Sequence, residues 1–289
     1  MSRTVRCGLI QAHYEHNLEQ EVSAIKDACV DQAVAWVEEA AERGAQLIAL
    51  PEFLVAPYFP VDQDRRWFSL AEQVPSGPTI QRLRELATRH RVALVVPVVE
   101  EERPGVYFAT AAVIDADGAY LGKYRKAHIP QGPPAYWEKF YFSPGNLGFP
   151  VFRTQYGRIG VGLGYDRRFP EVTRGLGLAG AEIVLIPGTA WTESERSLWE
   201  VELRASAVAN GLFVCASNRA GERPPGREEP FFGGSCVIGP DGVVLDRLDA
   251  HTSGVLVSEI DLSQIALANL ERPFYRDRRP ILYGPLKES

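Results

Sequence analysis

Polar residues suited to acid–base chemistry follow three apolar segments of the chain. Glu52 comes directly after one apolar run, Lys126 ends the basic stretch at 122–126, and a charged loop at 165–171 follows Gly164. A buried glutamate beside a lysine can pair a general base with an electrostatic stabiliser, although most such pairs are structural ion pairs. Ligands of layered α/β folds lie beyond the carboxyl ends of strands, so these positions favour a site.

The elements that must position these residues alternate along the chain. Short runs rich in Val, Ile and Leu predict strands, and longer periodic segments predict helices, an alternation that indicates an α/β fold. The expected strands cover residues 5–11, 46–50, 92–99, 111–115, 159–165, 182–186, 212–217, 235–238 and 254–260. The expected helices cover 19–43, 79–90, 172–179 and 194–210, the last with Thr192 or Ser194 as N-cap.

Two sequence echoes predict how these elements are arranged. Gly-Ala-Gln-Leu-Ile-Ala-Leu-Pro at 44–51 recurs as Gly-Ala-Glu-Ile-Val-Leu-Ile-Pro at 180–187, and the Asp-Gly hairpin at 113–121 recurs at 237–245. Such strings are common in strands and turns, but two echoes in the same order favour two similar halves. We therefore expect a single α/β domain built as a four-layer α-β-β-α sandwich with an internal pseudo-twofold, since no linker separates the halves.

Composition excludes several classes of protein. The chain has 289 residues and a formal net charge of −6, with no basic face or tail, which argues against nucleic-acid binding. No apolar run reaches the roughly 18 residues of a membrane helix, and the N-terminus lacks a signal-peptide pattern. The four cysteines are scattered, without spacing for a disulfide framework or a metal site. We expect a cytoplasmic protein with no membrane partner.

The three segments, taken in order, resemble the motifs of the carbon–nitrogen hydrolase (nitrilase) superfamily. Pro51-Glu52, Gly-Lys-Tyr-Arg-Lys at 122–126, Glu138 within 136–145, and Gly-Tyr-Asp-Arg-Arg-Phe-Pro-Glu at 164–171 carry the resemblance, which covers nearly the whole chain. It implies a Glu–Lys–Cys triad on an α-β-β-α sandwich, with Glu138 as the family's second glutamate.

Two stretches are most similar to the β-ureidopropionase and N-carbamoyl amino acid amidohydrolase branch. These are residues 137–146 and 274–280. The resemblance implies a small amide or ureido substrate, hydrolysis without metal or organic cofactor, and a homodimer or larger homo-oligomer. It also implies one domain over 1–289, with 273–289 as an interface tail.

The chain departs from the family at the nucleophile, where Gly164 stands in place of cysteine. In the family mechanism that the resemblance implies, Glu52 takes the thiol proton, and Lys126 with the N–H of Tyr165 stabilises the oxyanion. Without a side chain at 164 the thioester route is closed. None of the four cysteines is a convincing replacement, because their apolar surroundings are typical of buried structural thiols.

Two explanations of Gly164 remain open at this stage. It is either an introduced inactivating substitution or natural divergence, which Ala109 and Gln131 favour because they also depart from the family. A naturally divergent chain is either a ligand-binding protein without turnover or an enzyme with other chemistry. In the second case Glu52 activates a water lodged where the thiol would be, beside Lys126.

Further candidates follow strand ends near the same motifs. Arg167, Arg168 and Arg219 can each hold a substrate carboxylate, although structural salt bridges are the commoner role of such arginines. His128 either orients substrate or is a hydrogen-bonded structural imidazole. Trp191 either walls the pocket or packs in the core.

Overall fold

The computed structural model describes residues 3–14, 19–133, 135–250 and 252–284, and it consists of two six-stranded mixed sheets. The first sheet has the order β12-β1-β2-β3-β4-β5, and the second has the order β11-β10-β9-β8-β7-β6. The strands of the first sheet are β1 (Thr4–Gln11), β2 (Leu47–Ala49), β3 (Ala93–Arg103), β4 (Val106–Ile114), β5 (Tyr120–Arg125) and β12 (Gly254–Asp261). Those of the second are β6 (Val151–Thr154), β7 (Gly157–Val161), β8 (Ile183–Pro187), β9 (Phe213–Ser217), β10 (Cys236–Ile238) and β11 (Val244–Arg247).

The two sheets match strand for strand, which confirms the expected pseudo-twofold. β1, β2 and β3 are parallel neighbours, and β4 and β5 follow as antiparallel strands. β7 to β11 repeat this sequence of pairings. An antiparallel edge strand completes each sheet, β12 beside β1 and β6 beside β7.

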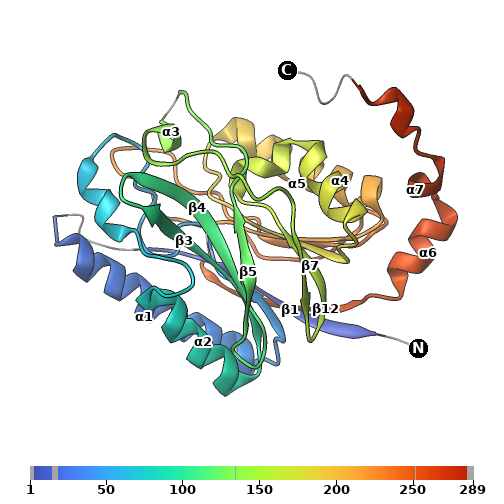
Figure 1. Cartoon of the computed structure of the whole chain (residues 1–289), viewed down its shortest axis with the longest axis horizontal. Helices are drawn as coiled ribbons and strands as arrows, with labels where there is room; N and C mark the ends of the chain where they lie inside the picture. Colours follow the sequence, from blue (N-terminus) through green and yellow to red (C-terminus); the bar gives the residue numbers. More distant parts are fainter. Residues whose placement is uncertain (1–2, 15–18, 134, 251, 285–289) are drawn as a thin grey trace.

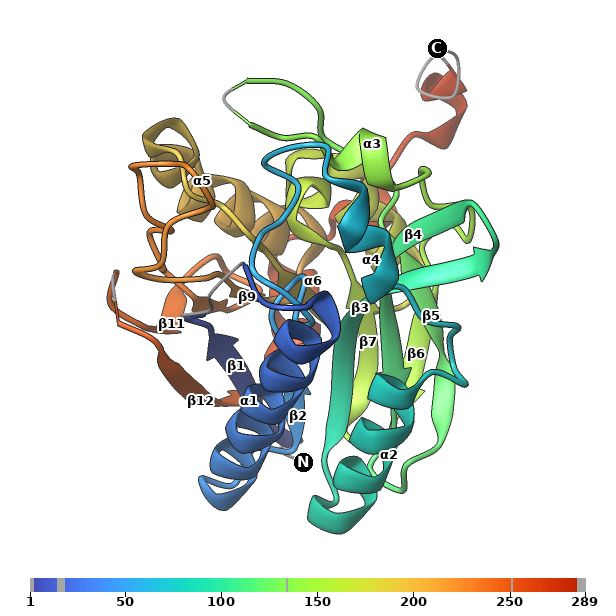
Figure 2. The ribbon, with the colours of Figure 1, turned by 90° about the vertical axis from the view of Figure 1, so that its left-hand side faces the viewer.

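Alternating side chains divide the core into three layers. Leu47 of β2 and Ile183 and Leu185 of β8 pack between the sheets, whereas Ile48 and Val184 point outward into separate clusters. The outward cluster on the first sheet is covered by α1 (Val22–Glu42) and α2 (Pro78–His90), and that on the second by α4 (Pro170–Leu178) and α5 (Glu193–Asn210). The result is the expected α-β-β-α sandwich (Figures 1 and 2).

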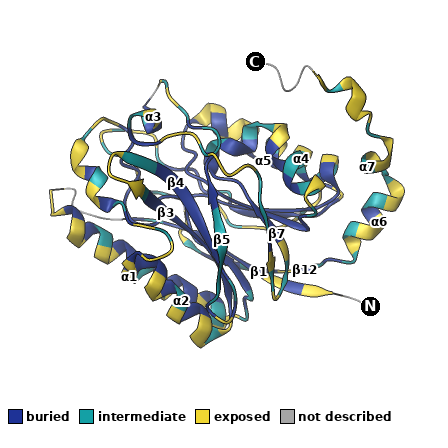
Figure 3. Cartoon of the chain, in the orientation of Figure 1, coloured by how far each residue is buried: buried dark blue, intermediate teal, exposed yellow. Residues whose placement is uncertain are grey.

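The short helices surround this sandwich. They are η1 (Arg65–Leu70), α3 (Glu138–Tyr141), η2 (Gly164–Arg168), α6 (Gln264–Glu271), α7 (Phe274–Asp277) and η3 (Pro280–Leu282). The last three follow β12 and lead away from the sheets, with outer faces largely exposed (Figure 3). Within the described ranges, no helix combines the length and apolar character that crossing a membrane requires.

The structure differs from the predicted elements at their ends, in three strands and in the short helices. Strands β5, β6 and β11 are not among the expected strands, although the predicted hairpins at 113–121 and 237–245 reach the first residues of β5 and β11. The strand expected over 159–165 ends at Val161, because Gly164 adopts a left-handed φ of 42° and begins η2. The helix expected from 19 begins at Val22. Of the two residues predicted as N-cap of α5, Thr192 is the one that caps the helix, and it forms a capping box with Glu195.

Candidate active site

A buried lysine lies between two buried glutamates where the first sheet ends. Glu52 follows β2, Lys126 follows β5, and Glu138 is the first residue of α3. Lys126 Nζ donates to Glu52 Oε1 at 2.8 Å and to Glu138 Oε2 at 2.6 Å, and each of the three residues is 1% exposed. The structure thus brings together the three charged residues that the motifs predicted.

Charge balance decides the protonation of this cluster. Burial alone would lower the pKa of Lys126, but the carboxylates of Glu138 and Glu52 outweigh it and raise that pKa above its ordinary value. Burial raises the pKa of Glu138 to about 7. The negative charge of Glu52 raises this pKa further, whereas the positive charge of Lys126 lowers it. Lys126 is therefore an ammonium at neutral pH, and the cluster carries one buried negative charge in excess when both glutamates are ionised.

Gly164 borders this cluster from the second sheet. A Cβ built on Gly164 would lie 3.0 Å from both Cδ and Oε1 of Glu52, and closer still to Oε2. The Glu52 carboxylate therefore fills the space that a side chain at 164 would use. The water beside Glu52 that the sequence-based hypothesis invokes stays a prediction.

The second carboxylate oxygen of Glu52, which does not contact Lys126 within hydrogen-bond distance in the described contacts, accepts a hydrogen bond from Thr189. The Thr189 hydroxyl donates to Glu52 Oε2 at 2.8 Å, and Thr189 is 6% exposed. Sequence reasoning missed this residue, although the chain contains a signal for it. Thr189 follows the echo at 180–187 much as Glu52 follows the echo at 44–51, so the pseudo-twofold delivers both residues to one place.

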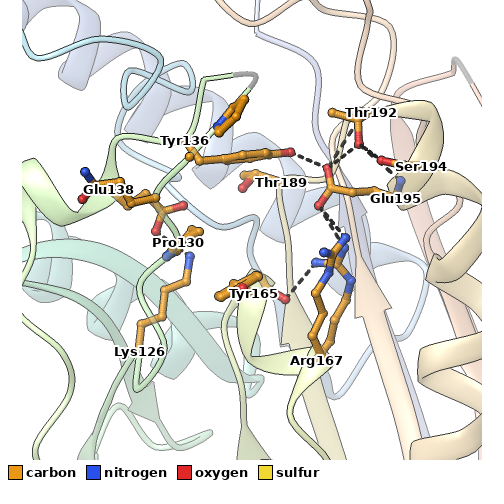
Figure 4. A pocket seen from close by; sticks show the side chains of 15 residues that line it. Lys126, Pro130, Tyr136, Glu138, Tyr165, Arg167, Thr189, Thr192, Ser194 and Glu195 are labelled. Carbon is orange, nitrogen blue, oxygen red and sulfur yellow. Dashed lines mark hydrogen bonds and ion pairs between the residues drawn. The ribbon is translucent and has the colours of Figure 1, made fainter.

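A cavity of about 200 Å³ opens onto the cluster (Figure 4). Lys126, Glu138, Gly164, Tyr165 and Thr189 line one part of it. A second set of lining residues comes from the loop before α3, from η2 and from the start of α5: Gln131, Tyr136, Arg167, Arg168, Thr192 and Glu195. The volume is below the range of drug-sized pockets and suits a small ligand.

The charged groups around Glu195 are mostly engaged with one another. Glu195 accepts from Arg167 at 3.0 Å, from Tyr136 and from the backbone N–H of Trp191. Arg167 is 5% exposed and also donates to the carbonyl oxygen of Gly164 at 3.0 Å. It therefore fixes the turn at η2 at the place where it lines the cavity.

Arg168 is the least constrained cation lining the cavity. Its side chain is 31% exposed, and its contacts are long, 3.4 Å to Glu195 and 3.6 Å to Glu202. Of the arginines predicted to hold a substrate carboxylate, Arg168 has both the exposure and the position.

Three predicted ligand-binding residues do not line the cavity among the described residues. Arg219 is completely buried and donates to the carbonyl oxygens of Glu52, Phe53 and Ala56, because it clamps the loop after β2. His128 pairs through Nδ1 with Asp166 at 2.8 Å, which fits the structural alternative. Trp191 is buried and its ring packs against that of Tyr136, with ring centroids 5.7 Å apart.

The four cysteines do not supply the missing nucleophile. All are free and buried, and burial raises the pKa of Cys29 and of Cys236 to about 12. Such thiols stay protonated near neutral pH and are inert.

Comparisons with known proteins identify the family of this chain. The carbon-nitrogen hydrolase family model matches residues 6–269. N-carbamoylputrescine amidase from Oryza sativa subsp. japonica is 37% identical, covering 92% of this chain and 93% of that protein. Beta-ureidopropionase from Arabidopsis thaliana is 32% identical, covering 90% of this chain and 67% of that protein.

A solved structure is similar over almost its whole length. The crystal structure of a carbon-nitrogen hydrolase from Helicobacter pylori G27 superposes with a TM-score of 0.88 at 30% identity, covering 99% of both chains. These matches confirm the family resemblance and the branch to which the motifs pointed. The chain belongs to the carbon–nitrogen hydrolase family.

Proposed function

We propose that the cavity holds a small N-carbamoyl amine or related amide with its carbonyl oxygen at Lys126. The observation that carries this proposal is the Lys126 ammonium, which lines the cavity while two of its three protons are engaged by Glu52 and Glu138. The third proton remains for an oxygen in the cavity. A charged donor fixed in a water-poor site stabilises an oxyanion more strongly than one in water does.

The other members of the cluster then have separate roles. Glu138 holds Lys126 in place, with Tyr58 donating to its Oε1 at 3.1 Å. Glu52 is the base, and the N–H of Tyr165 provides a second donor for the carbonyl oxygen. Gly164 offers no thiol, so the thioester route of the family is absent from this chain.

The substrate's other end is expected to reach Arg168. Glu195 is engaged by Arg167 and Tyr136, so the most exposed charge among the described residues at that end of the cavity is the positive charge of Arg168. We therefore propose that an N-carbamoyl compound with a carboxylate tail binds more tightly than one with an ammonium tail. N-carbamoyl-β-alanine and N-carbamoylputrescine represent the two classes.

We also propose that copies of this chain associate in the cytoplasm. The proposed interface tail, residues 273–289, follows α6, and Leu270 and Ile281 are 78% and 84% exposed. Free buried cysteines favour a reducing compartment. Sedimentation of the full chain should give a dimer or larger species, and Leu270→Asp with Ile281→Asp should dissociate it. A monomer in both cases would refute the association.

The site itself is tested by giving it a thiol. Ammonia release from both N-carbamoyl compounds is compared for the unaltered chain, Gly164→Cys and the control Gly162→Cys. A Cβ on Gly162 meets only ordinary contacts, 3.6 Å or more, and Gly162 does not line the described part of the cavity. We expect Gly164→Cys to release ammonia well above the control.

The same experiment includes a binding measurement. Calorimetry should detect a heat of binding when either compound is added to the unaltered chain. The Lys126→Met variant should show no heat of binding. If Gly164→Cys is folded by its melting temperature, releases no ammonia and binds neither compound, the proposed substrate class is wrong.

A further inference from the structure

Among the hydroxyl side chains described in the cavity lining, that of Thr189 is hydrogen-bonded to the Lys126 cluster, through Glu52. Thr189 lines the cavity with Lys126 and Gly164, whereas Glu52 lies behind them and is not among the lining residues described. The hydroxyl donates to Glu52 Oε2 at 2.8 Å, within the reach required of a nucleophile and its base.

One carboxylate links this hydroxyl to the ammonium. Glu52 Oε1 accepts from Lys126 Nζ at 2.8 Å, and its Oε2 accepts from Thr189. A base on one side of the hydroxyl and a cation for the developing oxyanion are therefore held in fixed relation, which is the arrangement that acyl transfer requires.

This arrangement depends on glycine at position 164. A Cβ there would lie within 3.0 Å of the Glu52 carboxylate, so the carboxylate would have to shift from the position in which it accepts from Thr189. The substitution that removes a thiol is also what allows the base to reach the threonine.

The loop that carries Thr189 is firmly held on both sides. Gly188 N donates to the carbonyl oxygen of Ser217 at 2.8 Å. The side chain of Asn218 accepts from Ala190 N at 2.8 Å and donates to Ala190 O at 2.9 Å. A nucleophile fixed in this way loses little conformational freedom at the transition state.

We propose that Thr189 Oγ1 is the nucleophile of this chain, an inference that rests on the substrate class proposed above. Glu52 takes the hydroxyl proton while Oγ1 bonds to the carbonyl carbon, and the carbonyl electron pair moves onto the oxygen beside Lys126. The C=O bond then re-forms, the C–N bond to the substituted nitrogen breaks, and the departing amine takes the proton from Glu52. Water hydrolyses the resulting carbamoyl ester, with Glu52 accepting the water's proton and returning one to Oγ1, and the released carbamic acid breaks down to CO2 and ammonia.

Thr189 could instead act only as a positioning residue for Glu52, and a covalent adduct distinguishes the two roles. The full chain is mixed with N-carbamoylputrescine or N-carbamoyl-β-alanine, quenched in acid, and mapped by peptide mass. The variants are Thr189→Val, Thr189→Ser and the control Thr110→Val. Thr110 is also buried and donates to a glutamate, Glu100, at 2.6 Å, but lies outside the described cavity lining.

We expect the adduct on the peptide that contains Thr189, in the unaltered chain and in Thr189→Ser. Thr189→Val should lose the adduct and about 100-fold or more of the ammonia release, since activation of a nucleophile by a base contributes on the order of 10²–10⁴. Thr110→Val should behave as the unaltered chain. If Thr189→Val does not fold, the presence or absence of the adduct in the unaltered chain and in Thr189→Ser still shows whether Thr189 is the nucleophile.

Two results overturn the inference. One is turnover by the unaltered chain without an adduct on Thr189, and the other is no turnover by the unaltered chain at all. In either case, ammonia release by Gly164→Cys would leave the proposed substrate class standing. Absence of both binding and turnover in every variant would remove the substrate class as well.

Discussion

Replacing Lys126 by methionine tests the charge balance of the buried cluster. The substitution keeps most of the side-chain volume but leaves Glu52 and Glu138 without the ammonium that lies 2.8 and 2.6 Å from them. Removing one partner of a buried ion pair costs about 3–5 kcal/mol because the remaining charge is uncompensated. With an unfolding entropy of roughly 2.1 cal/mol/K per residue, that corresponds to a fall in Tm of about 5–8 °C.

The cost should depend on pH with a defined sign. Loss of the ammonium raises the pKa of Glu138 beyond the value of about 7 that burial already gives it. A carboxyl whose pKa is raised in the folded state stabilises that state at low pH, and this contribution disappears as pH rises through the raised pKa. The penalty of Lys126→Met should therefore be smaller near pH 5 than near pH 8.

Lys123→Met is the matched control, measured by urea and thermal unfolding beside Lys126→Met. Lys123 pairs with Glu100, but Glu100 keeps Arg125 at 2.7 Å after the substitution. The expected cost is only about 1 kcal/mol. Equal penalties for the two variants, or a Lys126→Met penalty that does not shrink at low pH, would refute the reasoning.

Three further predictions concern single residues. Glu138→Gln should flatten the pH dependence of stability. The pKa of Glu138 is raised from 4.5 to about 7 in the folded chain, and at about 1.36 kcal/mol per pKa unit the unaltered chain should lose roughly 2 kcal/mol relative to the variant between pH 5 and 7. Urea unfolding at several pH values measures this, and parallel curves would contradict it. Gly164→Ala should lower stability by about 1–3 kcal/mol in thermal unfolding, because it places a Cβ at a left-handed φ and against Glu52; an unchanged Tm would count against the described position of Glu52. Arg219→Lys should cost about 2–3 kcal/mol in the same assay, since a lysine cannot replace the bonds to Glu52 O, Phe53 O and Ala56 O together, and a neutral result would show that the clamp is dispensable.

Local pattern and repetition were sufficient to predict the layers of the fold and its internal repeat. The echo of 44–51 in 180–187 corresponds to β2 and β8, which occupy equivalent places in the two sheets. Thr192 and the acid three residues later predicted the start of α5, because a capping box depends only on neighbouring residues. The helices α6 and α7 were not predicted, since a segment that lies against few partners shows little hydrophobic periodicity.

Side-chain direction was the part that sequence did not provide. Arg167, Arg168 and Arg219 all follow strand ends, yet Arg168 alone is partly exposed at the cavity, because the other two satisfy buried carbonyl oxygens and carboxylates. The contact of Glu52 with Thr189 joins residues 137 positions apart. It depends on the rotamer that Gly164 permits, which no local pattern encodes.

A crystal structure of the full chain soaked with N-carbamoyl-β-alanine would show whether Lys126 receives the carbonyl oxygen of a small N-carbamoyl compound. We expect the ureido oxygen within hydrogen-bond distance of Lys126 Nζ, the carbonyl carbon facing Thr189 Oγ1, and the carboxylate at Arg168. A compound bound with its ureido group away from Lys126, or an empty cavity at saturating concentration, would contradict it.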